Sequence, residues 1–177
     1  MTKFNTKTIA LIGMFVALAV IGRTLMAPIP SVQPVTAIVV ISGILLGKRA
    51  GLSTGILVAL LTGITTGLGW WTIAQAVGWG VGGLIGGMIR VDQKRLMIMA
   101  GVVATVAFSI VMNGSGAFMM GLPLSGYLAY ATASLPFDLI HLASTVGFTI
   151  VLLPIAIALF KRFDSALIDS RSNIVKK

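Results

Sequence analysis

Residues 72–89 read TIAQAVGWGVGGLIGGMI and contain no charged side chain. A run of this length can cross the hydrocarbon core of a bilayer as one helix, and it lacks the alternation of a half-buried strand. Glycines recur every four residues, at Gly78, Gly82 and Gly86, a spacing that lets helices approach closely in a membrane. The segment therefore predicts a membrane-spanning helix packed among other helices.

The composition extends this prediction to the whole chain. Of the 177 residues, 57% are hydrophobic and 10% are charged, whereas a soluble domain carries about 25% charged residues. The mean hydropathy is +1.05. With no cysteine and a single histidine, the chain lacks the residues of a disulfide or a conventional zinc site. We expect an all-α integral membrane protein without a metal or cofactor.

Apolar runs interrupted by Gly, Pro or charged residues predict six transmembrane helices in a single domain over residues 1–177. Gly residues, Pro123 and both tyrosines of the chain dilute the hydrophobicity of residues 114–135. We expect this stretch to be an outer loop with a partly helical, interfacial piece. The expected spans are residues 8–26, 34–47, 50–67, 72–89, 96–113 and 136–160.

The basic residues predict the orientation, because Lys and Arg favour the cytoplasmic side of a membrane. With a cytoplasmic N-terminus, every Lys and Arg except Arg23 lies on that side, and both termini are cytoplasmic. This topology explains the net charge of +9 without a nucleic-acid partner. The cytoplasmic set comprises Lys3, Lys7, Lys48, Arg49, Arg90, Lys94, Arg95, Lys161, Arg162, Arg171, Lys176 and Lys177.

Polar and aromatic residues near the outer ends of the spans are candidate ligand contacts. Trp71, Gln75 and Trp79 are spaced four apart, which predicts a shared helix face. An amide between indoles suits either helix packing or a large, flat, partly polar ligand. Further candidates on other spans and loops are Gln33, Thr36, Asn113 and Tyr127.

Asp138 and His141 lie three residues apart in the last span, so they share a helix face. Ionisable groups inside a membrane are energetically unfavourable and mark a functional or a paired site. Arg23 is the only basic residue expected toward the outside, which makes it the natural partner of Asp138. Two interpretations stay open: a structural Arg23–Asp138 ion pair with His141 beside it, or direct contact of Asp138 and His141 with a ligand.

Three other function classes are less favoured. Residues 43–49, GILLGKR, are one residue short of a phosphate-binding loop, so we do not expect ATP hydrolysis by this chain. Ser115 and His141 could be the nucleophile and base of an intramembrane serine protease. However, the local sequence NGSG differs from the G-x-S-G pattern that such proteases have around the nucleophile. A solitary secondary transporter would show inverted repeats and several buried ionisable groups, whereas one such cluster is present here.

The first span carries a stripe of small residues, Ala10, Gly13 and Ala17. Together with LPFDLIH at residues 135–141 and the six-span layout, this stripe resembles the substrate-binding S component of an energy-coupling factor (ECF) vitamin transporter. The segments QPVT at 33–36 and GWWTIAQ at 69–75, followed by Trp79, are most similar to the cobalamin-type branch. Gly13 departs from the family pattern, which usually has Ala there.

The resemblance implies a transport subunit of the bacterial cytoplasmic membrane, not an enzyme. This subunit would capture a vitamin, with cobalamin as the best candidate, in an outer cavity gated by residues 27–34 and 114–126. Its implied partners are a transmembrane coupling subunit, docked on Ala10, Gly13 and Ala17, and two cytoplasmic ATPases of an ABC-type importer. Riboflavin, pantothenate and a pyrimidine precursor are the alternative vitamins.

Overall fold

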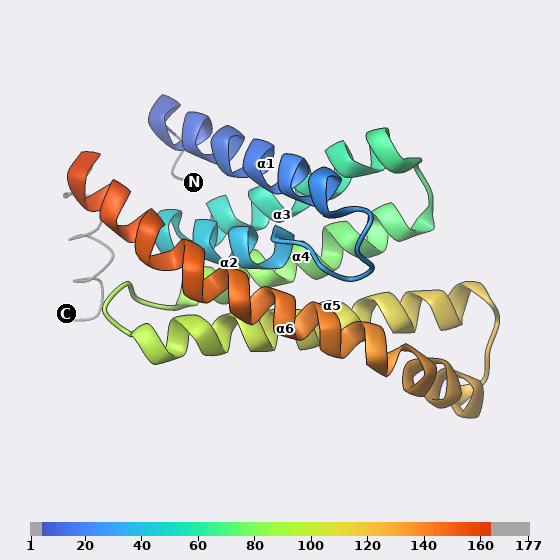
Figure 1. Cartoon of the computed structure of the whole chain (residues 1–177). Helices are drawn as coiled ribbons and strands as arrows, with labels where there is room; N and C mark the ends of the chain where they lie inside the picture. Colours follow the sequence, from blue (N-terminus) through green and yellow to red (C-terminus); the bar gives the residue numbers. More distant parts are fainter. Residues whose placement is uncertain (1–4, 164–177) are drawn as a thin grey trace.

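The computed structural model describes residues 5–163 as α-helices joined by short connections (Figure 1). Within this part of the chain no strand occurs, and the predicted all-α fold with six helices is confirmed. Lys3, Arg171, Lys176 and Lys177 lie outside the described residues. The helices are α1 (Thr6–Met26), α2 (Val35–Leu46), α3 (Lys48–Thr66), α4 (Trp70–Met88), α5 (Lys94–Met119) and α6 (Leu124–Phe163).

Successive helices run in alternating directions. Figure 1 shows that α1 begins and α6 ends at the same end of the bundle, where the α2–α3 and α4–α5 connections also lie. The basic clusters at residues 48–49, 90–95 and 161–162 therefore gather at one end, and Arg23 lies toward the other. This arrangement is the one that the orientation prediction requires; the side of the membrane that each end faces stays a prediction.

The central helix, α2, contacts all five other helices. It has 12 residues, all buried except Leu46, and at 1.5 Å per residue it spans about 18 Å. That length is well below the ~30 Å hydrocarbon core, so α2 is enclosed by its neighbours instead of facing lipid. Among the described residues, four helices (α1, α3, α5 and α6) are long and apolar enough to cross a membrane.

Glycines of α4 allow close contact with three neighbouring helices. A Cβ on Gly83 would collide with the backbone of Gly51 in α3, and one on Gly86 would collide with the backbone of Val40 in α2. On another side, a Cβ on Gly78 would approach the Phe108 ring of α5 to 2.7 Å. These glycines pack inside the bundle, in agreement with the packing expected of small residues in membrane helices.

The prediction of an outer loop over residues 114–135 is wrong. The α5 helix continues to Met119 and α6 begins at Leu124, so the connection is short, with Gly121 at φ 63°. Lower hydropathy does not end a helix, and internal prolines are tolerated in membrane helices when neighbouring groups satisfy the freed backbone. Pro136 and Pro154 accordingly lie inside the 40-residue α6, whose first turns deviate from the axis of the rest in Figure 1.

Candidate functional site

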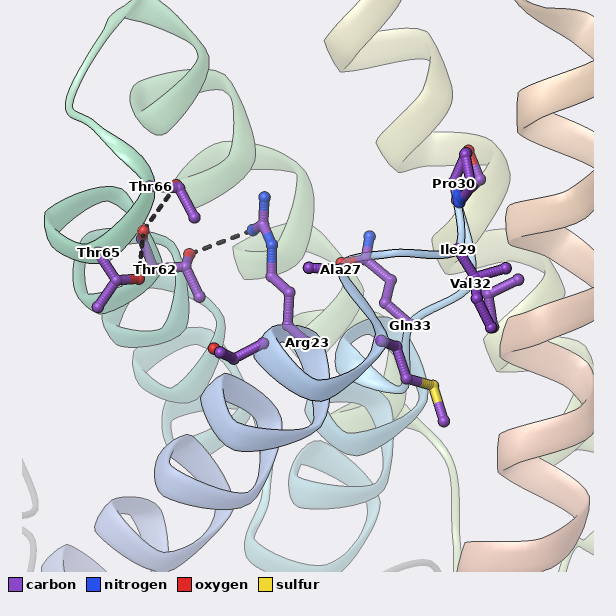
Figure 2. Close-up of a pocket in the computed structure, with 12 residues that line it drawn as sticks. Arg23, Ala27, Ile29, Pro30, Val32, Gln33, Thr62, Thr65 and Thr66 are labelled. Atoms are coloured by element: carbon purple, nitrogen blue, oxygen red, sulfur yellow. Dashed lines mark hydrogen bonds between the residues drawn. The ribbon is translucent and has the colours of Figure 1, made fainter.

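A cavity of about 470 Å³ lies between the end of α1, the following loop and the end of α3 (Figure 2). Its volume falls in the range of about 300–1,000 Å³ that is typical of small-molecule sites. Under the predicted orientation this end of the bundle faces outward. The cavity is lined by Arg23, Thr24, Met26, Ala27, Ile29, Pro30, Ser31, Val32, Gln33, Thr62, Thr65 and Thr66.

The loop that forms one wall of the cavity is held at both ends. Near α1, the Ile29 N–H donates to the Met26 carbonyl at 2.9 Å. At the other end, the Gln33 N–H donates to Ser144 Oγ at 3.0 Å, and the Ser144 hydroxyl donates to the Gln33 carbonyl at 3.1 Å. The predicted candidate Gln33 therefore lines the cavity while its backbone is fixed to α6.

Arg23 brings a positive charge into this cavity. Its Nη1 donates to Thr62 Oγ1 and to Gln75 Oε1, both at 3.2 Å, and Figure 2 shows the side chain extending from α1 toward Thr62. The guanidinium carbon lies 5.0 Å from the centroid of the Trp79 ring, within the distance of a cation–π contact. Of the five N–H donors of an arginine, those on Nε and Nη2 make no hydrogen bond within the described residues.

The predicted Arg23–Asp138 ion pair does not form. The Asp138 carboxylate instead lies 2.9–3.0 Å from three side-chain donors, Ser109 Oγ, Asn113 Nδ2 and Ser134 Oγ, the last of which shares its single proton with the Ala131 carbonyl. Neutral donors therefore surround the carboxylate, whereas the guanidinium meets neutral acceptors through Nη1 alone and lies over the face of the Trp79 indole. The pairing was predicted from opposite charge alone, although such neutral partners can stabilise a charge inside a protein as well.

Beneath the cavity, Trp79 and His141 meet through one hydroxyl. The fully buried Trp79 donates from Nε1 to Thr36 Oγ1 at 3.1 Å, and Thr36 Oγ1 lies 3.0 Å from His141 Nε2. The Thr36 hydroxyl therefore links the indole of Trp79 to the imidazole of His141. Phe108 stacks on Trp79 and contacts His141 edge-on, with ring centroids 5.2 Å apart in both pairs.

This buried layer, Thr36, Trp79, Phe108 and His141, joins four helices under the cavity. Arg23 connects it to the cavity, because its guanidinium lies over the Trp79 ring while its side chain lines the cavity, and Gln75 accepts a hydrogen bond from this guanidinium. Trp71 does not join the inner face that was predicted for it: its side chain is 38% exposed and its Nε1 donates to the Gly67 carbonyl at 3.3 Å.

Two further candidates belong to a different place. Asn113 and Tyr127 line, together with Asp138, a separate cavity of about 260 Å³ between α5 and α6. Asp138 and His141 share a helix face by spacing, yet His141 points to the buried layer and Asp138 bonds to the α5 side chains. The residues predicted to form one ligand site therefore lie in several separate places.

Sequence reasoning missed the threonines of α3. Thr62 donates to the Val58 carbonyl, and Thr65 and Thr66 donate to the Thr62 carbonyl. Because these hydroxyl protons are used inside the helix, the side chains offer oxygen lone pairs to the cavity. The run TGITT at residues 62–66, directly before a glycine break, is the signal from which they could have been found.

The residues considered for a protease are engaged elsewhere. Ser115 donates to the Met112 carbonyl at 3.0 Å, and His141 bonds to Thr36. No hydrogen bond joins Ser115 to His141 within the described residues, so the nucleophile–base contact that a serine mechanism uses is not part of this arrangement.

The small-residue stripe of α1 lies on the outside of the bundle. Ala10, Gly13 and Ala17 are exposed, and a Cβ on Gly13 would have no atom within 4 Å. The buried side of the helix is formed by other residues, namely Ile12, Phe15, Val16 and Ala19.

Comparison with known proteins gives the family. Residues 7–163, which include nearly all of the six helices, match the model of the family described as ECF transporter, substrate-specific component. No curated protein and no solved structure matched the chain. The arrangement of the helices and this match over most of the sequence lead to one assignment: the chain belongs to the family of substrate-specific components of ECF transporters.

Proposed function

We propose that this substrate-binding subunit captures a vitamin in the 470 Å³ cavity between α1 and α3. One observation carries the proposal: Arg23 lines the cavity with its Nε and Nη2 donors unused and without a carboxylate partner among the described residues. Hydrogen-bond donors that are left unused beside a cavity are available to an acceptor group of a ligand. The ligand we infer has a carboxylate or carbonyl group for Arg23 and hydroxyl or amide donors for the threonines.

Cobalamin is the first candidate, on the sequence resemblance. Its peripheral amides would use both the Arg23 donors and the threonine oxygens. The corrin is larger than the compact sites of this volume class, so the 27–34 loop would have to move outward to admit it. That movement would break the backbone bonds between Gln33 and Ser144.

Pantothenate is the second candidate, and the cavity itself favours it. A compact vitamin fits a volume of about 470 Å³ without movement of the loop. Its carboxylate would take the free donors of Arg23, and its hydroxyls and amide would meet Gln33 and the α3 threonines. Charge-assisted bonds from arginine to a carboxylate are among the stronger polar contacts.

Binding titrations of the purified chain test these candidates. Cobalamin, pantothenate, riboflavin and a pyrimidine precursor are added separately, with binding followed by calorimetry and, for the corrinoid, by its visible absorption. We expect saturable one-to-one binding of one vitamin, and weaker binding of that vitamin by Arg23→Gln. If none of them binds, or if binding is unchanged in Arg23→Gln, the cavity is not the substrate site.

We further propose that the exposed stripe of α1 docks the transmembrane coupling subunit, with the two ATPases joined to that subunit, in a bacterial cytoplasmic membrane. Small side chains let a partner helix approach closely, and Ala10, Gly13 and Ala17 have no such partner inside the bundle.

Replacing Gly13 and Ala17 together by Leu should abolish vitamin uptake and co-purification with the ATPases. Vitamin binding by the isolated chain should change less than about two-fold, because exposed side chains contribute little to folding. The matched control is leucine at Ala143, which is also exposed but lies on α6. Normal uptake by the Gly13/Ala17 variant would rule out this docking surface.

A further inference from the structure

A second groove lies at the other end of the bundle, between the start of α5 and the last turns of α6. Its volume is about 460 Å³. Lys94 and Lys161 lie at its rim, and apolar side chains that include Ile98, Leu153 and Ile157 form its walls. It is lined by none of the residues of the vitamin cavity, so it is a separate feature of the molecule.

The polarity of this groove changes along its length. On α6 its lining extends from Thr149 to Lys161, which at 1.5 Å per residue is about 18 Å. This length equals about half of the ~30 Å hydrocarbon core, the depth of one leaflet. Both lysines lie in the membrane-edge turns of their helices, and the deeper part is apolar apart from Thr149. A charged end followed by one leaflet of apolar wall is complementary to a phospholipid.

The charge at the rim selects an anionic headgroup. Lys94 and Lys161 are exposed, and among the described residues neither ammonium group has an acidic partner. Lys94 is also the first residue of α5, and the preceding Gln93 makes no side-chain capping bond. Free N–H groups at a helix N-terminus favour an anion, so the start of α5 adds to the positive potential beside Lys94.

We propose that this groove binds one anionic phospholipid, with the phosphate between Lys94 and Lys161 and an acyl chain along Ile98, Leu153 and Ile157. Under the predicted orientation the lipid belongs to the cytoplasmic leaflet, where basic residues near the surface attract anionic lipids. The proposal goes beyond vitamin capture and does not depend on which vitamin is bound.

Native mass spectrometry of the full chain, titrated with phosphatidylglycerol or phosphatidylcholine, tests the proposal. The variant K94Q/K161Q removes both charges, and K48Q/R95Q is the matched control, because these two residues are exposed near the same end but do not line the groove. A158L keeps both lysines and fills the groove from an exposed wall position. sn-Glycerol 3-phosphate serves as a competitor that has the phosphate without the acyl chains.

We expect one tightly retained phosphatidylglycerol on the parent and about five-fold weaker retention for each lysine lost, hence about 25-fold for K94Q/K161Q. A158L should weaken retention as well, and the control should stay within two-fold of the parent. Equal retention by K94Q/K161Q and the parent would overturn the proposal. An equal loss of retention in K48Q/R95Q would also overturn it, because general surface charge would then explain the binding. Displacement of the lipid by sn-glycerol 3-phosphate would overturn it as well, because the site would then bind phosphate without the acyl chains.

Discussion

Arg23 and Asp138 are the two charged residues that the sequence placed toward the outer half of the membrane, and the structure satisfies them in different ways. Asp138 accepts hydrogen bonds from Ser109 and Asn113, and it shares the single proton of Ser134 with the Ala131 carbonyl. Arg23 uses one of its three nitrogens, with Trp79 beneath it. The carboxylate is thus completed by the protein, whereas the guanidinium is left with donors for a ligand.

This difference suggests different roles for two residues that are both ionisable and both lie in predicted membrane spans. An ionisable group inside a membrane is expected to mark function, but the expectation does not distinguish a group that binds a ligand from one that joins two helices. The number of unused donors or acceptors makes that distinction. By this criterion Asp138 ties α6 to α5, and Arg23 is the residue that we propose to contact the ligand.

Truncation of Trp79 to Ala should have the largest effect. The ring is fully buried, stacks on Phe108 and donates to Thr36, so its removal leaves a cavity and takes one of its hydrogen bonds from the Thr36 hydroxyl. We expect a loss of about 3–5 kcal/mol in the free energy of unfolding. Chemical unfolding in detergent, followed by far-UV circular dichroism, measures it.

Trp71→Ala is the matched control for this experiment, because the same side chain is removed from a position that is 38% exposed on the same helix. Its loss should be below about 1 kcal/mol, in the range of surface substitutions. If the two variants lose the same free energy of unfolding, the buried Trp79 contributes no more to stability than the exposed Trp71.

Replacement of Arg23 by Gln should come next in size, and it acts on binding. The vitamin identified by titration should lose charge-assisted hydrogen bonds worth about 1.5–3 kcal/mol, which corresponds to a roughly 10- to 150-fold increase in Kd. Arg23→Lys keeps the charge but loses the planar fork of donors. Its Kd should therefore lie between those of the parent and Arg23→Gln. Asp138→Asn should change Kd less than about two-fold; a larger effect there than in Arg23→Gln would reverse the two roles.

The sequence predicted the features that depend on hydrophobic patterns along the chain, and it missed those that depend on contacts between distant residues. Apolar runs located all six helices, because a membrane requires continuous apolar helices. The start of α6 was missed, since Gly, Tyr and Pro123 lower hydropathy without preventing a helix. The partners of Arg23 were missed as well, because Thr62 and Gln75 are neutral and lie 39 and 52 residues away in sequence. Only the fold brings such acceptors together.

The smallest expected effect is the coupling between Arg23 and Asp138, measured by a double-mutant cycle of Arg23→Gln, Asp138→Asn and the double variant. The two side chains share no hydrogen-bond partner within the described residues, so their contributions to the free energy of unfolding should add within about 0.5 kcal/mol. A buried ion pair behaves differently, because loss of one partner strands the other charge at about 3–5 kcal/mol, and the second substitution recovers much of that loss. Unfolding midpoints in detergent for the four proteins distinguish the two cases. A coupling of several kcal/mol would restore the ion pair that the sequence predicted and would remove Arg23 from the ligand site, since its charge would then be satisfied by the protein.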